Sequence, residues 1–456
     1  MTIKSACYRA LGRFKKRTPQ KRVLPSKKHQ LTDDQISNQA CMVMERLVES
    51  GYSAYLVGGS VRDVMVSLKP KDFDVVTDAT PEEINRLFRQ SRIIGRRFRL
   101  VHVYGRGDVT EVSTFRANSQ TVVHVATDTD ADEMPMVIDD NTYGTIEEDA
   151  WRRDFTINAL FYDYAEGTII DFTGGVSDIK SRRVAMIGDA TQRFHEDPVR
   201  LLRAIRMAAK LDFSIEKQTY RALLELPGLL QHVAPARLFD EVGKLFFTGH
   251  ALSSYEWLLK TGYFEHIFPQ VHKLIMRDEG TKRLVRQAMK ETDDRFASGK
   301  SLNPGYLLAV LYWPIVQEEI AQLLASGYRL SRALPLSFRS ALALSRKHLA
   351  IPKRFQAMMQ SIWSMQYHLE KERPKRIERL LMHRYCRAAV DFLELRVRSG
   401  WKEGQGLAKN WRKRLNDAKH TYASSRRTRP SRDGRHSNRG RSRRPRRDSR
   451  TSGRHD

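Results

Sequence analysis

The stretch Leu56–Asp74, LVGGSVRDVMVSLKPKDFD, places a glycine turn between two strand-like runs. The apolar run Tyr55–Val57 predicts a buried strand that stops at Gly58-Gly59-Ser60, and a short helical pattern follows. After a turn at Lys69–Lys71 the chain enters Asp72–Val76, which predicts a second strand.

Asp72 and Asp74 are two residues apart in the second predicted strand, so their side chains share one face, with Phe73 turned toward the core. Two neighbouring carboxylates repel each other unless a cation lies between them, and a divalent metal ion is suited to that role. The glycine turn leaves backbone N–H groups free to approach phosphate. This combination predicts phosphoryl or nucleotidyl transfer, whereas a solvated acidic turn is the alternative.

The basic charge lies mainly in two tails. Residues 1–29 carry ten Lys and Arg and no acid, and residues 424–456 carry 13 Arg and three Asp. Each tail therefore contributes +10 to the formal charge of +27, which leaves +7 for the residues between them. Both tails are poor in large apolar residues, so we expect disorder and binding to RNA or DNA, the alternative being a solubility or targeting tail.

The three cysteines, Cys7, Cys41 and Cys386, have neither metal-site spacing nor a disulfide framework, which fits a reducing compartment. No N-terminal signal pattern and no bilayer-length apolar run is evident. The sequence therefore predicts a cytoplasmic protein that does not bind membranes.

Further strand patterns follow at Ile93–Ile94, Leu100–Tyr104 and Val109–Thr114. Glu111 on the last of these is a candidate third carboxylate of a metal site, or else an exposed residue of an edge strand. Thr145–Asp154 predicts a capped helix ending in Arg153 and Asp154. The planar guanidinium of Arg153 suits phosphate or a base edge, and Asp154 could orient it; the alternative is an exposed helix end.

From Glu196 the pattern becomes helical. In Glu196–Arg206 the apolar residues form one stripe, and Arg200, Arg203 and Arg206 lie opposite it. Asp197 fits an N-cap before Pro198. We expect the acids present to be too few to neutralise three arginines at this spacing, so an anionic ligand or RNA is the predicted partner, against a solvated face as the alternative.

Helical patterns continue to residue 399, and beyond Gly400 the chain is predicted to become a basic tail. The predicted helices are 235–248, 253–261, 281–292, 306–325, 335–349, 353–369 and 375–399. The predicted fold class is α+β: a mixed β-sheet with flanking helices, followed by an all-α part.

Five motifs in this order resemble the class II nucleotidyltransferases, the family of tRNA CCA-adding enzymes and bacterial poly(A) polymerases. They are LVGGSVRD at 56–63, KDFDVVT at 71–77, EVSTFR at 111–116, RRDFTINAL at 152–160 and EDPVRLLRAIR at 196–206. The resemblance implies a disordered extension (1–30), a catalytic head (31–165), a neck (166–260), a helical body (261–400) and an Arg-rich disordered tail (401–456).

The resemblance also implies residue roles. Asp72 and Asp74 would bind two Mg²⁺ ions, and Asp154 would be the further catalytic acid, in competition with Glu111. The nucleotide, with ATP as substrate, would meet two sets of residues. These are Gly58, Gly59, Ser60, Arg62 and Arg153 on the triphosphate side, and Asp197, Arg200, Arg203 and Arg206 toward the base.

Within the family, IGRRFRLVHV at 94–103 and the Arg-rich C-terminus resemble poly(A) polymerases. The predicted function is therefore template-independent addition of AMP to RNA 3′ ends, on mRNA and other transcripts, promoting RNA decay. CCA addition to tRNA is the alternative, and a catalytically inactive RNA-binding protein is a further one. We expect a monomer that contacts RNA-decay or RNA-chaperone proteins.

Overall fold

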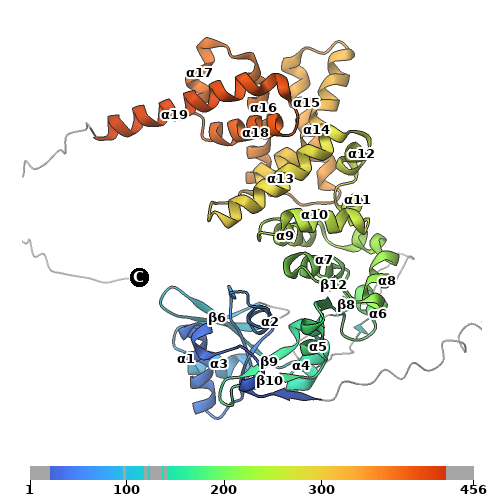
Figure 1. Ribbon diagram of the computed structural model, residues 1–456, viewed down its shortest axis with the longest axis vertical. Coiled ribbons are helices and arrows are strands. Elements are labelled where there is room, and N and C mark those ends of the chain that lie inside the picture. Colours follow the sequence, from blue (N-terminus) through green and yellow to red (C-terminus); the bar gives the residue numbers. More distant parts are fainter. Residues whose placement is uncertain (1–20, 96–98, 118–121, 124–135, 138–141, 428–456) are drawn as a thin grey trace, which may run out of the picture.

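The computed structural model describes residues 21–95, 99–117, 122–123, 136–137 and 142–427 (Figure 1). An eight-stranded mixed sheet forms the N-terminal part, in the order β1-β10-β9-β2-β3-β6-β5-β4. Its strands are β1 Arg22–Leu24, β2 Ala54–Val57, β3 Asp74–Thr77, β4 Ser91–Ile94, β5 Leu100–Tyr104, β6 Val109–Thr114, β9 Leu160–Asp163 and β10 Thr168–Asp171. The only parallel pairing in this sheet is that of β3 with β6. Short pairs are formed by β7 Val122–Val123 with β8 Met136–Val137, and by β11 Arg183–Val184 with β12 Ser214–Ile215.

Five helices accompany the sheet: α1 Asn38–Glu49, α2 Gly59–Met65, α3 Pro81–Leu87, α4 Ile146–Arg152 and α5 Gly175–Lys180. Thr80 begins α3 and Thr145 begins α4, each through a capping box with a glutamate three residues later. The central strands β2 and β3 bury Leu56 and Val75 completely, and this shared buried face fixes the register of the two strands.

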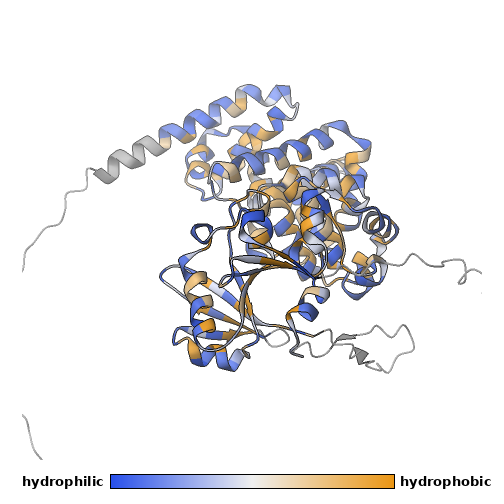
Figure 2. Cartoon of the chain, turned by 60° about the horizontal axis from the view of Figure 1, so that its bottom comes forward, coloured by the Kyte–Doolittle hydropathy of each residue, from blue (hydrophilic) through white to orange (hydrophobic). Residues whose placement is uncertain are grey.

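The remainder is helical and continues the hydrophobic core upward from the sheet in Figure 1. Its α-helices are α6 Ala190–Glu196, α7 Val199–Leu211, α8 Lys217–Glu225, α9 Pro235–Phe246, α10 Ala251–Lys260, α11 Tyr263–Ile267, α12 Pro269–Arg277, α13 Glu279–Ala297, α14 Pro304–Ala325, α15 Leu330–Arg346, α16 Lys353–Lys371, α17 Pro374–Leu381, α18 Cys386–Arg398 and α19 Gln405–Arg427. Figure 2 shows apolar residues concentrated between these helices and polar ones on their outer faces.

The predicted fold class is confirmed, but several predicted boundaries are wrong. The N-terminal extension is not wholly disordered, because β1 pairs with β10 at the edge of the sheet. The same sheet continues to Asp171, beyond the predicted head boundary at residue 165. The predicted tail begins with an ordered helix, α19, whose Trp411 is fully buried. Residues 1–20 and 428–456 lie outside the described part.

Helix α14 is apolar and long enough to cross a membrane, contrary to the prediction that no run has that length. In the structure 61% of the most apolar 18-residue stretch of this helix is buried. It packs against α13, α15 and α16, so its composition is that of a core helix.

Candidate active site

The turn between β2 and α2 is built by glycine. Gly58 has φ +77° and is the N-cap of α2, a conformation that side chains other than glycine rarely adopt. A Cβ atom on Gly58 would lie 3.5 Å from a guanidinium nitrogen of Arg153. That distance is an ordinary contact, so glycine is required here by the positive φ, and the turn lies beside Arg153, one of the predicted site residues.

Asp74 opens β3, directly opposite Glu111 of the parallel strand β6. Asp72 precedes the strand rather than lying in it, contrary to the prediction. Burial by the surrounding protein raises the pKa of Asp74 to about 6, although water still reaches the side chain. The charges of Glu111 and Asp72 raise the pKa further, and Arg153 opposes them. Asp72, Asp74 and Glu111 thus concentrate negative charge around the start of β3, in the middle of the sheet.

This charge fits a divalent cation, since carboxylate oxygens are the ligands that Mg²⁺ prefers. Among the described residues, no three His, Cys, Asp or Glu side chains already form a metal site. On its other side Glu111 lies 3.3 Å from the ring nitrogen Nε2 of His102.

Asp154, the expected third acid, lies in a different environment. It is buried, and its carboxylate pairs with Arg203 of α7 at 2.7 Å and accepts from Asn158 at 3.1 Å. Burial alone would raise the pKa of Asp154, but Arg203 and these hydrogen bonds hold it below the ordinary value. The structure therefore places Glu111, and not Asp154, beside Asp74, while Asp154 joins the sheet domain to α7.

Arg62 is buried and its guanidinium already has partners. It binds Asp63 through two nitrogens at 2.9 and 2.6 Å and Asn158 at 2.5 Å. Asp63 in turn pairs with Lys210 of α7 at 2.7 Å. Sequence reasoning missed the structural role of Asp63 and Lys210; the only local signal was the position of Asp63 directly after Arg62.

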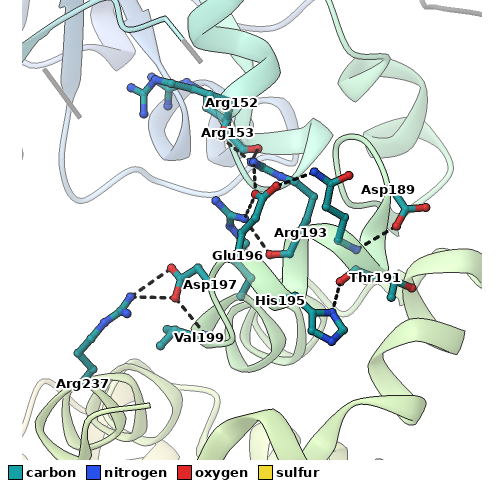
Figure 3. A network of polar contacts seen from close by, with 12 residues as sticks. Arg152, Arg153, Asp189, Thr191, Arg193, His195, Glu196, Asp197, Val199 and Arg237 are labelled. Atoms are coloured by element: carbon teal, nitrogen blue, oxygen red, sulfur yellow. Dashed lines mark hydrogen bonds and ion pairs between the residues drawn. The ribbon is translucent and has the colours of Figure 1, made fainter. Parts of the chain in front are cut away.

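Figure 3 shows the polar network where α6 meets the end of α4. Arg193 donates to the backbone carbonyls of Arg152 and Arg153 at 2.6 and 2.7 Å, and pairs with Glu196 at 2.8 Å. These carbonyls belong to the residues immediately before Asp154, so Arg193 fixes the end of the RRD motif.

Asp197 lies just after α6 in the same view. It accepts from the N–H of Val199 at 3.3 Å and from Arg237 of α9 at 3.1 Å. Its carboxylate therefore lies at the start of α7 and is also held from α9, but the N-cap of α7 is Pro198 and not Asp197, contrary to the prediction.

The arginines of α7 all have acidic partners, which the sequence interpretation did not expect. Arg200 pairs with Glu196 at 3.0 Å, Arg203 with Asp154 at 2.7 Å and Arg206 with Glu241 at 2.8 Å. The prediction that the acids could not neutralise all three is wrong, because Asp154 comes from the sheet domain and Glu241 from α9. This face is an interface between elements and not an open anion-binding surface.

Three family descriptions match the chain. "Poly A polymerase head domain" matches residues 54–185, "Probable RNA and SrmB- binding site of polymerase A" matches 212–275, and "Polymerase A arginine-rich C-terminus" matches 326–449. A solved structure of the Bacillus stearothermophilus CCA-adding enzyme in complex with CTP has a TM-score of 0.56 at 23% identity. The match covers 83% of this chain and 82% of the CCA-adding enzyme chain, which shows that the two share a fold.

Curated relatives give the family. Poly(A) polymerase I of Escherichia coli O6:H1 is 40% identical over 384 residues, which is 83% of this chain and 82% of the relative. Poly(A) polymerase I of Salmonella typhi is 39% identical over 86% of this chain and 85% of its own, and that of Haemophilus influenzae is 38% identical over 86% and 87%. The chain therefore belongs to the bacterial poly(A) polymerase I family, nucleotidyltransferases related to the CCA-adding enzymes.

Proposed function

We propose that this protein adds adenylate to RNA 3′ ends without a template, releasing pyrophosphate from ATP. Membership of the family implies RNA and ATP as substrates. The observation that carries the proposal is the 40% identity to a poly(A) polymerase I over 83% of the chain. A CCA-adding enzyme of Lactococcus lactis is 38% identical but over only 50% of the chain, which favours polyadenylation over CCA addition.

Asp72 and Asp74 would hold two Mg²⁺ ions, with Glu111 as the neighbouring carboxylate. When bound, these ions supply charge neutralisation for the triphosphate and acidify the RNA 3′ hydroxyl. The chain's own contribution is positioning: the Gly58 turn brings the backbone to the phosphates, and Arg153 lies between that turn and Asp74. Arg153 is itself aimed by its ion pair with Asp149 at 2.8 Å.

Asp197 and Arg200 would present the edge that selects the base. The pair of Arg237 with Asp197 and the pair of Glu196 with Arg200 keep these side chains from turning freely. We also propose that the enzyme acts as a monomer in the cytoplasm and that its products are directed to RNA decay.

The decisive experiment offers each nucleoside triphosphate separately with a non-tRNA oligonucleotide. Long products formed only with ATP support the proposal. CTP incorporation confined to tRNA lacking its CCA end would replace it with CCA addition, and RNA binding without extension by any nucleotide would point to an inactive RNA-binding protein.

Substitution of the carboxylates tests the metal site. Asp72→Ala and Asp74→Ala should each lower the extension rate about 100-fold or more, because preorganised charge at the transferring phosphate is lost. RNA affinity, measured by filter binding, should stay unchanged. Glu166→Gln, on an exposed turn, is the matched control; near-normal extension by either Asp variant would contradict the assignment.

A further inference from the structure

We propose that Phe296 is a positioning residue for the catalytic carboxylates and acts through Lys71. This inference rests on the proposed function. The ammonium Nζ of Lys71 lies 4.4 Å from the centroid of the Phe296 ring, at the C-terminal end of α13. A cation over an aromatic face is attracted by the ring quadrupole. The contact joins the helical body to the residue immediately before Asp72.

The Phe296 ring is held in place by the turn between α9 and α10. Gly249 has φ +92°, and a Cβ atom there would lie 2.6 Å from the ring, so only glycine allows this packing. One turn earlier on α13, Asp293 accepts from the backbone N–H groups of Ala251 and Leu252 at 2.6 and 2.9 Å, at the start of α10. The end of α13 and the start of α10 are therefore one fixed unit, which presents the ring to Lys71.

The sheet domain also approaches the helices that follow it near Gly249. His250 is half-buried beside Gly249, and burial lowers the pKa of its ring. The charges of Asp293, Lys210, Lys71 and Asp63 act on that ring, so His250 lies within electrostatic reach of the sheet domain, α7 and α13 together. The contact between Lys71 and Phe296 is thus part of a junction between three segments of the chain.

The segment that carries Asp72 needs such an anchor. Between Leu68 and Phe73 the chain forms neither helix nor strand, and Asp74 is the first residue of β3. Held by Phe296, this segment presents Asp72 in a fixed place, and a displacement of about 1 Å is enough to reduce catalysis strongly.

The cation–π contact with Phe296 also holds the Lys71 ammonium away from the carboxylates. A free ammonium one residue from Asp72 and three from Asp74 would otherwise pair with these carboxylates and compete with the metal ions. Phe296 therefore serves both the position and the charge of the site.

A double-mutant cycle in the full chain tests this inference. The variants are Phe296→Leu, which keeps an apolar side chain of similar reach, Phe296→Tyr, which keeps the aromatic face, Lys71→Met, and Lys71→Met combined with Phe296→Leu. Thermal unfolding confirms that each variant folds. The readouts are Mg²⁺ affinity by calorimetry in the presence of a non-hydrolysable ATP analogue, and kcat and KM for ATP.

Phe296→Leu should weaken Mg²⁺ affinity about two- to five-fold, the equilibrium equivalent of an exposed cation–π contact. The loss should appear in kcat more than in KM for ATP, and Phe296→Tyr should restore the wild-type values. In the Lys71→Met background, Phe296→Leu should have no further effect.

An equal loss from Phe296→Leu in both backgrounds would overturn the inference, since the ring would then act only by packing. An unchanged Mg²⁺ affinity in a folded Phe296→Leu variant would overturn it as well. Failure of the proposed function is a separate outcome, because wild-type protein would then make no A-only products while the calorimetric cycle could still be measured.

Discussion

The carboxylate of Asp149 holds two neighbouring arginines, one on each of its oxygens. Its oxygen Oδ1 accepts from Arg152 at 2.6 Å, and Oδ2 pairs with Arg153 at 2.8 Å. The carboxylate is fully buried. Burial alone would raise the pKa of Asp149, but Arg153 and then Arg152 outweigh it and hold the pKa below its ordinary value. Asp149 therefore orients Arg153 toward the glycine turn.

Asp149→Asn should lower the free energy of unfolding at pH 7 by about 3–5 kcal/mol, because two arginines lose a buried counter-charge. The folded pKa is the lower one, so the wild-type contribution is complete above the unfolded value of 3.8 and is lost as the pH falls through the folded value. Urea unfolding from pH 7 to pH 3 should show the difference between variant and wild type shrinking below about pH 4. A pH-independent difference would contradict this account.

Arg193 binds the backbone of the Arg152-Arg153-Asp154 motif, whereas Asp149 binds its arginine side chains. Arg193→Lys cannot donate in parallel to the carbonyls of Arg152 and Arg153, so kcat/KM for ATP should fall about ten-fold or more, the equivalent of one charge-assisted hydrogen bond. Arg182→Lys is the control, because its pair with Asp212 is exposed. If both variants kept wild-type kcat/KM, Arg193 would have no positioning role.

At the residue scale, the sequence predicts which element carries a side chain but not which distant residue it pairs with. That Asp74 and Glu111 lie on strands could be predicted from strand periodicity, although the parallel pairing of β3 with β6, which sets them opposite each other, is a tertiary feature that local patterns do not reveal. The partners of Arg203 and Arg206 could not, because Asp154 and Glu241 are distant in sequence and reach α7 only through tertiary packing. The charges of a helix face alone do not reveal whether it is open.

At the scale of elements, α19 completes a small core at the C-terminal end. Trp411 is fully buried and its indole N–H donates to the carbonyl of Leu369 at 3.0 Å. Arg412 pairs with Asp391 and Glu394, each at 2.6 Å. Although its sequence resembles a basic tail, α19 is therefore held against α16 and α18 by the buried side chain of Trp411 and the ion pairs of Arg412.

Truncation after Gly404 should destabilise the helical body by about 3–5 kcal/mol, the cost of removing a buried tryptophan, and should lower the melting temperature in calorimetry. Truncation after Arg427 retains α19 and is the matched control. An unchanged melting temperature for the shorter chain would show that α19 does not stabilise the body.

Elements with strong local signals could be predicted from the sequence. The boundaries of β5 and β6 and the capped start of α4 agree with prediction. α17 and α18 were predicted as one helix, because the turn at residues 382–385 contains neither Gly nor Pro. α19 was missed because its apolar residues are few and its partners lie in α16 and α18.

At the scale of the whole molecule, the basic charge of the sequence is concentrated near its two ends. Residues 428–456 carry 11 Arg and three Asp, a net charge of +8. Truncation after Arg427 should weaken RNA affinity at low salt and flatten the dependence of log Kd on log salt, since fewer counterions are released. The extension rate at saturating RNA should change little. Equal affinity of full-length and truncated protein at low salt would refute the prediction.

The attachment of β1 at the sheet edge has a consequence for how long RNA is held. β1 begins at Arg22, just after most of the first basic tail, and α19 leads to the second; Figure 1 shows these two points near opposite ends of the long axis. The prediction that both basic tails bind RNA implies that one RNA would be held at two attachments, and its release would then require both to open. Such binding would raise the effective concentration of the 3′ end at the enzyme and favour repeated additions to the same strand.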